Sequence, residues 1–191
     1  MKFMIASDIH GSPVWCEKLL EAFKNEKADR LVLLGDILYH GPRNGLTPGY
    51  DPAKVAAMLN PFREKILAVR GNCDSEVDQM VLEFPMLADY AVIPAGTHLI
   101  YATHGHTHNM DSLPPLSPGD ILLHGHTHVP AWQEFGEGNL YLNPGSISIP
   151  KENTPNGYMT LTTGKDPLTG AETAVFEWKT AAGDAYHGIS L

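Results

Sequence analysis

The sequence has few features that would stabilise the chain covalently or place it in a membrane. Only two of its 191 residues are cysteines, Cys16 and Cys73, which excludes a disulfide scaffold and a cysteine-rich zinc site. No run reaches the roughly 18 apolar residues of a membrane span. The N-terminal segment also turns polar too early for a signal peptide. We therefore expect a cytoplasmic protein without a membrane partner.

Positive charge is also scarce. The 13 lysines and arginines are outnumbered by 22 aspartates and glutamates, so the formal net charge is −9. Binding to nucleic acid or to an anionic membrane depends on cationic side chains that neutralise phosphates, so neither partner is expected. A small phosphate-containing substrate held by metal remains compatible with this charge. The length and the 43% hydrophobic content fit a single domain over residues 1–191.

Short apolar runs alternate with helix-like segments in the first 75 residues. Strands are expected over 2–7, 31–34 and 65–70. Helices are expected to begin at Ser12-Pro13 and Asp51-Pro52, where a capping side chain precedes a proline. Such alternation is typical of parallel β-α-β units, which gather polar residues at the carboxyl ends of their strands. Four polar residues occupy such positions: Asp8, His10, Asp36 and Asn72.

From about residue 90 the pattern changes to strands separated by Gly, Pro and Asn. The expected strands are 90–93, 97–103, 120–123, 131–135, 139–142, 158–162 and 173–178. Nothing marks a linker between the halves, so we predict one α/β domain with two sheets covered by helices. The small and polar segment 180–191 is expected to fray.

Histidine, in contrast to cysteine, is abundant. Six of the ten histidines lie in two copies of His-Gly-His-Thr-His, at 104–108 and 124–128. In a strand-like segment residues i and i+2 point the same way, so His126 and His128 can face one centre. Mixed Asp, Asn and His donors suit Mn, Fe, Zn or Co. Their number exceeds the three protein ligands of a catalytic zinc site, which favours two ions that share a bridging carboxylate.

Five motifs occur in an order that resembles the signature of the calcineurin-like metallophosphoesterases, in particular their small bacterial and archaeal phosphodiesterases. They are Asp8-Ile9-His10, Gly35-Asp36, Gly71-Asn72-Cys73-Asp74, Thr103-His104-Gly105-His106 and Gly125-His126-Thr127-His128. The resemblance implies a four-layer α/β/β/α sandwich, with two mixed β-sheets flanked by helices. It also implies a site for two metal ions at the sheet edge.

The same resemblance assigns the ligands. Asp8, His10 and His128 would hold one ion, Asn72, His104 and His126 would hold the other, and Asp36 would bridge them. The implied ions are two Mn²⁺, with Zn²⁺, Fe²⁺, Co²⁺ or Ni²⁺ as alternatives. The implied reaction is hydrolysis of a small phosphodiester by in-line attack of a hydroxide that bridges the ions. Asp36 and Asn72 would then belong to the catalytic machinery.

Cys73 departs from the wider superfamily, which has a histidine at this position. A thiol is a poor general acid, so we expect this chain to depend on leaving groups that depart easily or on another acid, for which His106 is the best candidate. Cys73 itself is expected to pack as a small apolar residue. The predicted substrate-binding residues are Arg43, His106 and Asn72. For Arg43, the alternative is an ion pair with a local carboxylate.

Further residues near these motifs have more ordinary predicted roles. His108 and His124 fall outside the family pattern and are not expected to be ligands. Asp74 is expected to cap a helix that begins at Ser75-Glu76, with bracing of a ligating histidine as the alternative. The three tryptophans are expected to pack in the core or at its rim.

Three functions are compatible with this sequence. The leading one is a metal-dependent phosphodiesterase. A phosphomonoesterase or nucleotide phosphatase could use the same site, and an interaction scaffold resembling the retromer subunit of this fold is the alternative from another class. Since all seven predicted ligands are present, the scaffold is disfavoured. The substrate, the metal and the oligomeric state stay open, and the apolar loop 46–50 is a candidate interface in a homo-oligomer.

Overall fold

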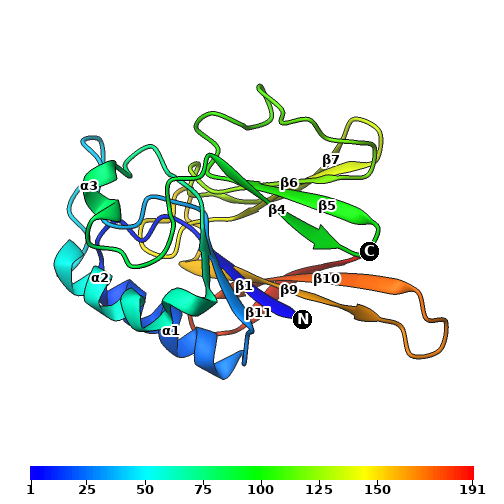
Figure 1. Ribbon diagram of the computed structural model, residues 1–191, viewed down its shortest axis with the longest axis horizontal. Helices are drawn as coiled ribbons and strands as arrows, with labels where there is room; N and C mark the ends of the chain where they lie inside the picture. The colour runs from blue at the N-terminus through cyan, green and yellow to red at the C-terminus, as the bar shows by residue number, and fades with distance from the viewer.

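Two mixed β-sheets stack on one another in the computed structural model, which describes all residues from 1 to 191 (Figure 1). The strands are β1 (Lys2–Ala6), β2 (Arg30–Leu33), β3 (Ile66–Ala68), β4 (Tyr90–Ala95), β5 (His98–Thr103), β6 (Ile121–His124), β7 (Pro130–Phe135), β8 (Asn139–Pro144), β9 (Gly157–Lys165), β10 (Glu172–Thr180) and β11 (Ala185–Ser190). The helices are α1 (Pro13–Asn25), α2 (Pro52–Leu59) and α3 (Glu76–Gln79), with a 3-10 helix at Asn60–Lys65. Each helix falls short of the length and hydrophobicity that a membrane span requires.

The strand order brings two sets of parallel strands together. One sheet has the order β11-β10-β9-β1-β2-β3, and the other has the order β4-β5-β6-β8-β7. β1, β2 and β3 run parallel in the first sheet, and β5, β6 and β8 run parallel in the second. The expected α/β sandwich of two mixed sheets is therefore confirmed. All the strands that we predicted are present, with their ends shifted by a few residues.

Both long helices begin where the sequence predicted. Ser12 accepts a hydrogen bond at Oγ from the backbone N of Trp15 at 3.4 Å, and Asp51 accepts one at Oδ1 from the backbone N of Lys54 at 2.9 Å. Each cap satisfies one of the free N–H groups of a first helical turn. A proline follows each cap, at a position where the missing N–H is not needed.

The central strands are buried on both faces, because they separate two cores. In β1, Met4 and Ala6 belong to the core beneath α1 and α2, whereas Phe3 and Ile5 belong to the core between the sheets. All four side chains are buried, as is usual for a strand covered on both sides. This packing holds the carboxyl end of β1 in a defined position.

The outer face of the five-stranded sheet lacks the helical layer that we expected. No helix follows α3, and the irregular segment 104–120 lies over this sheet instead (Figure 1). Leu122, His124 and Tyr141 on the strands of this sheet are nevertheless buried. Three prolines disfavour a helix in the covering segment: Pro114, Pro115 and Pro118.

The expectation of a fraying tail is wrong. Residues 185–190 form β11, which pairs antiparallel with β10 at the edge of the six-stranded sheet. His187 on β11 stacks on Trp132 with ring centroids 3.9 Å apart, and its ring meets Trp178 at 5.1 Å. The pairing uses backbone groups and the two aromatic contacts of His187, so the segment shows no run of apolar residues that would have revealed it.

We expect Trp178→Ala to lower the free energy of unfolding by about 3–5 kcal/mol. The Trp178 ring is fully buried and its Nε1 donates to the carbonyl oxygen of Asn143 at 2.8 Å, so truncation leaves a cavity and a free acceptor. Trp132→Ala is the matched control, since this ring is 42% exposed and should contribute less than half as much. Urea denaturation followed by circular dichroism measures both. Equal losses would contradict the placement of Trp178 in the core.

Candidate metal centre

The predicted ligands converge at one edge of the two sheets. Each follows the carboxyl end of a parallel strand: Asp8 and His10 after β1, Asp36 after β2, Asn72 after β3, His104 after β5, and His126 and His128 after β6. The stacking of the sheets therefore brings five loops from distant parts of the sequence to one place. This is the usual location of ligand sites in sheets with parallel strands.

Most of these residues adopt an unusual backbone conformation. Non-glycine residues with positive φ include five of the predicted ligands: Asp8 (61°), His10 (48°), Asp36 (54°), His126 (65°) and His128 (63°). Such a conformation costs about 1–3 kcal/mol per residue and is concentrated at functional sites. The prediction that His126 and His128 lie in a strand-like segment is therefore wrong. Their side chains turn inward because β6 ends at His124 and the chain then passes through left-handed turns.

Three of the side chains form a first buried cluster. Oδ1 of Asp8 lies 3.5 Å from Nε2 of His10 and 3.3 Å from Nε2 of His128. The two imidazole nitrogens face one another at 3.4 Å. All three residues are buried, with Asp8 and His10 completely inaccessible to solvent.

A second cluster lies beside the first. Nε2 of His104 lies 3.0 Å from Oδ1 of Asn72 and 3.1 Å from Nδ1 of His126. Asp36 belongs to both clusters, because its Oδ2 is 3.6 Å from Nε2 of His10 and 3.5 Å from Nε2 of His104. The arrangement gives two subsites that share one carboxylate oxygen.

The donor atoms fit divalent metal ions. Ligands bound to one ion at about 2.0–2.2 Å lie roughly 3.0–3.6 Å from each other in tetrahedral or octahedral geometry, and the separations above fall in this range. Oδ1 of Asp8 is buried without any hydrogen-bond partner, which is unfavourable unless a cation binds there. Nitrogen and carboxylate donors together are typical of Mn, Fe, Zn and Co.

Backbone carbonyl groups orient three of the imidazoles. The Nδ1 atoms of His10, His104 and His128 face carbonyl oxygens, namely those of Tyr39 at 2.9 Å, Leu34 at 2.7 Å and Ile149 at 2.7 Å, respectively. An Nδ1–H that donates to a carbonyl leaves the lone pair on Nε2, which is the atom that points into the site. His126 differs, because its Nδ1 rather than its Nε2 faces the second cluster, 3.1 Å from Nε2 of His104.

Electrostatics also prepare the donors for a cation. Burial opposes ionisation of Asp8, but the adjacent imidazoles of His10 and His128 hold the pKa of its carboxyl well below the usual value. Burial and the charge of His104 lower the pKa of His126 to about 4. At neutral pH the site therefore presents a carboxylate and a neutral imidazole, the forms that bind metal.

Asp74 is the residue whose predicted role is wrong. The cap of α3 is Ser75, which forms a capping box with Asp78. The buried carboxylate of Asp74 instead accepts hydrogen bonds from three backbone N–H groups: those of Asp36 at 2.8 Å, Ile37 at 2.9 Å and Gly71 at 2.7 Å. It braces no histidine either. Asp74 ties the loop that carries Asp36 to the loop that carries Asn72, and burial raises the pKa of its carboxyl to about 6.

The remaining histidines lie outside the two clusters. His106 is exposed, with its ring centroid 5.4 Å from that of His104 and 6.4 Å from that of His126. Burial and the charge of His104 lower the pKa of His106. His124 stacks on Tyr141 at 4.5 Å, and His108 packs edge-on against another ring. Neither His108 nor His124 belongs to a group of potential ligands.

The side chain of Cys73 lies beside two of the predicted ligands, whereas we expected it only to pack as a small apolar residue. Its Sγ groups with His10 and Asp36 as a potential ligand set, and its backbone N donates to Oδ1 of Asp36 at 2.8 Å. Burial and the charge of Asp36 raise the pKa of the thiol above its ordinary value, so it stays protonated at neutral pH. Nδ2 of Asn72 donates to this sulfur at 3.2 Å.

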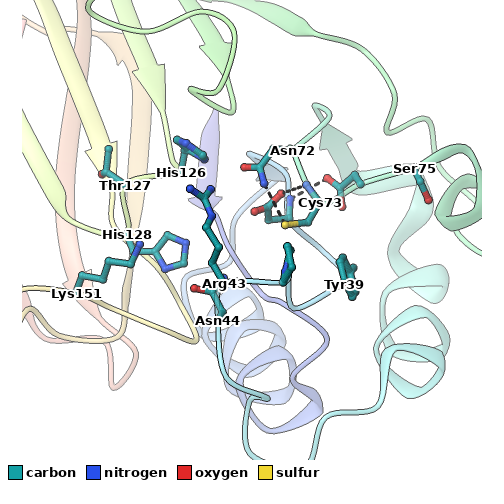
Figure 2. A pocket seen from close by; sticks show the side chains of 14 residues that line it. Tyr39, Arg43, Asn44, Asn72, Cys73, Ser75, His126, Thr127, His128 and Lys151 are labelled. Carbon is teal, nitrogen blue, oxygen red and sulfur yellow. Dashed lines mark hydrogen bonds between the residues drawn. The ribbon is translucent and has the colours of Figure 1, made fainter.

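A cleft of about 770 Å³ opens beside the two clusters (Figure 2). Its walls comprise Asp36, Tyr39, Gly41, Pro42, Arg43, Asn44, Asn72, Cys73, Asp74, Ser75, His126, Thr127, His128 and Lys151. In Figure 2 the side chain of Arg43 rises from its loop between His128 and Asn72. It forms no ion pair, in contrast to Arg63 and Arg70, so the alternative of a local carboxylate partner for Arg43 is wrong.

Sequence reasoning missed Lys151, Tyr39 and Thr127, which also line the cleft. Lys151 and Tyr39 lie in no recognisable motif. Lys151 stands 23 positions beyond His128 in the sequence, and only the fold brings it back to the site. Tyr39 lies in the loop after Asp36, and Thr127 lies between His126 and His128 in the last of the five motifs, so proximity to predicted ligands was the available signal for both.

Comparisons with known proteins agree with this architecture. The sequence model of a protein family, the calcineurin-like phosphoesterase superfamily domain, matches residues 1–166. Phosphodiesterase YfcE of Escherichia coli strain K12 is 51% identical over 158 residues, which are 83% of this chain and 85% of YfcE. The solved structure of the E. coli phosphoesterase Yfce superposes with a TM-score of 0.88 at 43% identity, covering 99% of this chain and 98% of that one. Zn²⁺-complexed Vps29 from Entamoeba histolytica shares the fold, with 20% identity, a TM-score of 0.59, and coverage of 100% and 98%.

We expect Asp74→Asn to weaken binding of Mn²⁺ about 10–100-fold. Asparagine offers one carbonyl oxygen where the carboxylate now serves three N–H donors, so the loops of Asp36 and Asn72 lose their common anchor. Isothermal titration calorimetry of the metal-stripped protein measures the affinity. Asp78→Asn, in the cap of α3, is the control that should leave it unchanged. Full affinity in a folded Asp74→Asn protein would show that other contacts hold the loops.

Proposed function

This chain belongs to the calcineurin-like phosphoesterase superfamily and is a phosphoric ester hydrolase, and we propose that it hydrolyses small-molecule phosphodiesters with two divalent metal ions. The single observation that supports two ions is the position of Asp36, whose Oδ2 lies within 3.6 Å of an imidazole nitrogen in each cluster. One carboxylate oxygen can serve both subsites at once. In this proposal Asp8, His10 and His128 would hold one ion, Asn72, His104 and His126 would hold the other, and Asp36 would serve both.

Two bound ions of this kind supply an activated water and neutralise charge on a phosphoryl group. The ions that we propose are Mn²⁺, because the donors are nitrogen and oxygen atoms without a thiolate. The acidic chain with no basic run is consistent with a small substrate rather than a nucleic acid. The presence of all seven predicted ligands favours a catalytic function over a non-catalytic scaffold.

The side chains around the cleft have complementary parts in this reaction. Asn72 directs Oδ1 towards the second cluster and keeps its Nδ2 at the cleft, where it can donate to a phosphoryl oxygen. Arg43 has no carboxylate partner, and a guanidinium can donate two parallel hydrogen bonds to a phosphate. We therefore assign the reacting phosphate to a position between Asn72 and Arg43, where the oxygen of water bonds to phosphorus as the ester P–O bond breaks.

The leaving alkoxide needs a proton, and we assign this role to His106, whose lowered pKa means that its protonated, acid form is populated mainly below neutral pH. The thiol of Cys73 holds its proton too tightly to donate it, because burial and Asp36 raise its pKa. His106 stands exposed beside His104 and His126, on the rim of the second cluster. A diester substrate is favoured over a monoester because the related YfcE is named a phosphodiesterase. A phosphomonoesterase with the same site is the alternative.

Metal-stripped protein should regain hydrolysis of a p-nitrophenyl phosphodiester on addition of Mn²⁺, and should hydrolyse the matched monoester more slowly. Release of p-nitrophenolate after separate addition of Mn²⁺, Zn²⁺ or Mg²⁺ measures this. Asp36→Asn should lower kcat at least about 100-fold, since the shared oxygen loses its charge. Asp111→Asn, an exposed carboxylate, is the control. Full activity and full metal content in Asp36→Asn would refute the bridging role.

The role of His106 is tested by the dependence on the leaving group. His106→Asn should lower kcat by about 100-fold for an alkyl or phenyl phosphodiester, whose leaving group requires protonation. The loss should be much smaller for a p-nitrophenyl ester, because p-nitrophenolate departs without a proton. His108→Asn, in the same segment but outside the clusters, is the matched control. An equal loss with both classes of substrate would contradict general acid catalysis by His106.

A further inference from the structure

The turn at residues 151–154 is strained, and neither the metal clusters nor the proposed reaction uses it. Glu152 and Asn153 are consecutive non-glycine residues with positive φ, 54° and 58°. Asparagine tolerates this conformation, but glutamate rarely adopts it. Thr154 holds the turn closed, because its backbone N and its Oγ1 donate to the carbonyl oxygen of Lys151 at 3.0 and 2.7 Å. Such strain persists only where the surrounding contacts impose it, and it is concentrated at functional sites.

The turn fixes Lys151 beside the metal centre. The backbone N of Lys151 donates to the carbonyl oxygen of His128 at 3.1 Å. This hydrogen bond holds the backbone of Lys151 next to a residue of the first cluster. Its side chain lines the cleft with those of His126 and His128 (Figure 2). Like most lysines of the chain, Lys151 has no carboxylate partner, but it is the one lysine that lines this cleft.

The carboxylates of the cleft do not pair with Lys151, which leaves its charge available to an anionic ligand. Asp36 and Asp74 are buried and already bonded, so the walls contain no free carboxylate for Lys151. In the proposed function, the reacting phosphate would already be bound at the two side-chain clusters and by Asn72 and Arg43. In a chain with a net charge of −9, the unpaired ammonium group of Lys151 is suited to attract a second anionic group of the ligand.

The size of the cleft agrees with a ligand larger than one phosphate. Its volume of about 770 Å³ lies within the roughly 300–1,000 Å³ typical of sites that enclose whole metabolite-sized molecules. We propose that Lys151 binds a second phosphate group of the substrate, so that the preferred substrates are phosphodiesters of which one arm carries a further phosphate. This assignment rests on the proposed function for the reaction itself, but the binding of the second phosphate can be measured without turnover.

The test compares two nucleotides that differ by one phosphate. Thymidine 5′-monophosphate and thymidine 3′,5′-bisphosphate are titrated into the Mn²⁺-loaded protein by isothermal titration calorimetry. The wild-type protein should bind the bisphosphate about tenfold more tightly, as expected for a charge-assisted contact. Lys151→Met should abolish this preference, Lys151→Arg should retain it, and Lys165→Met, at the distant end of β9, should leave it unchanged. Higher salt should reduce it.

The same comparison applies to catalysis, with the p-nitrophenyl ester of thymidine 5′-phosphate with and without a 3′-phosphate. The ratio of the two kcat/KM values should fall about tenfold in Lys151→Met. If the wild-type protein binds both nucleotides equally, or if the preference survives in Lys151→Met, the inference is overturned. If the binding preference follows Lys151 but neither ester is hydrolysed, the second phosphate site stands and the proposed phosphodiesterase function fails.

Discussion

The geometry of the site depends on how the carboxylate of Asp36 is held. One oxygen, Oδ2, faces an imidazole nitrogen of each cluster, and the other, Oδ1, accepts a hydrogen bond from the backbone N of Cys73. Its own backbone N donates to Asp74, and its φ of 54° turns the side chain inward. Every rotation that could move the carboxylate is therefore opposed by a contact from another loop. A carboxylate free to rotate would serve one cluster or the other, but not both.

The strained turns at the predicted ligands persist because the packing of the sheets behind them offsets their unfavourable conformations. Five of the predicted ligands adopt left-handed backbone conformations, each of which is unfavourable by itself. Two buried cores, one beneath the helices and one between the sheets, hold the ends of the strands that precede these turns. Hydrogen bonds then hold the turns themselves: the hydroxyls of Ser146 and Ser148 donate to the carbonyl oxygen of Asp8 at 3.1 and 2.6 Å. The protein's own packing and hydrogen bonds thus hold the predicted ligands in place.

The loop that carries Arg43 shapes the cleft through a close contact with Cys73. Gly41 adopts a φ of 80°, and a Cβ at this position would lie only 2.8 Å from Sγ of Cys73. Glycine is therefore required here, and the small thiol leaves room for the loop to approach. The same loop carries Arg43, which lines the cleft together with Asn72. Cys73 thus has a structural part at the centre, even though its protonated thiol is a poor acid.

The sequence by itself determined the order of the elements and the identity of the clustered residues. Apolar runs, capped helix starts and five ordered motifs are local signals, and each depends on residues close together in the chain. The tertiary structure alone decided what depends on distant contacts. Asp74 braces two loops because residues 36 and 71 become neighbours across parallel strands. β11 forms because β10 offers a free edge, and Lys151 reaches the cleft because its backbone bonds to His128. Such contacts leave no periodic pattern in the chain, since a hydrogen bond to a backbone group places little demand on the sequence of its partner.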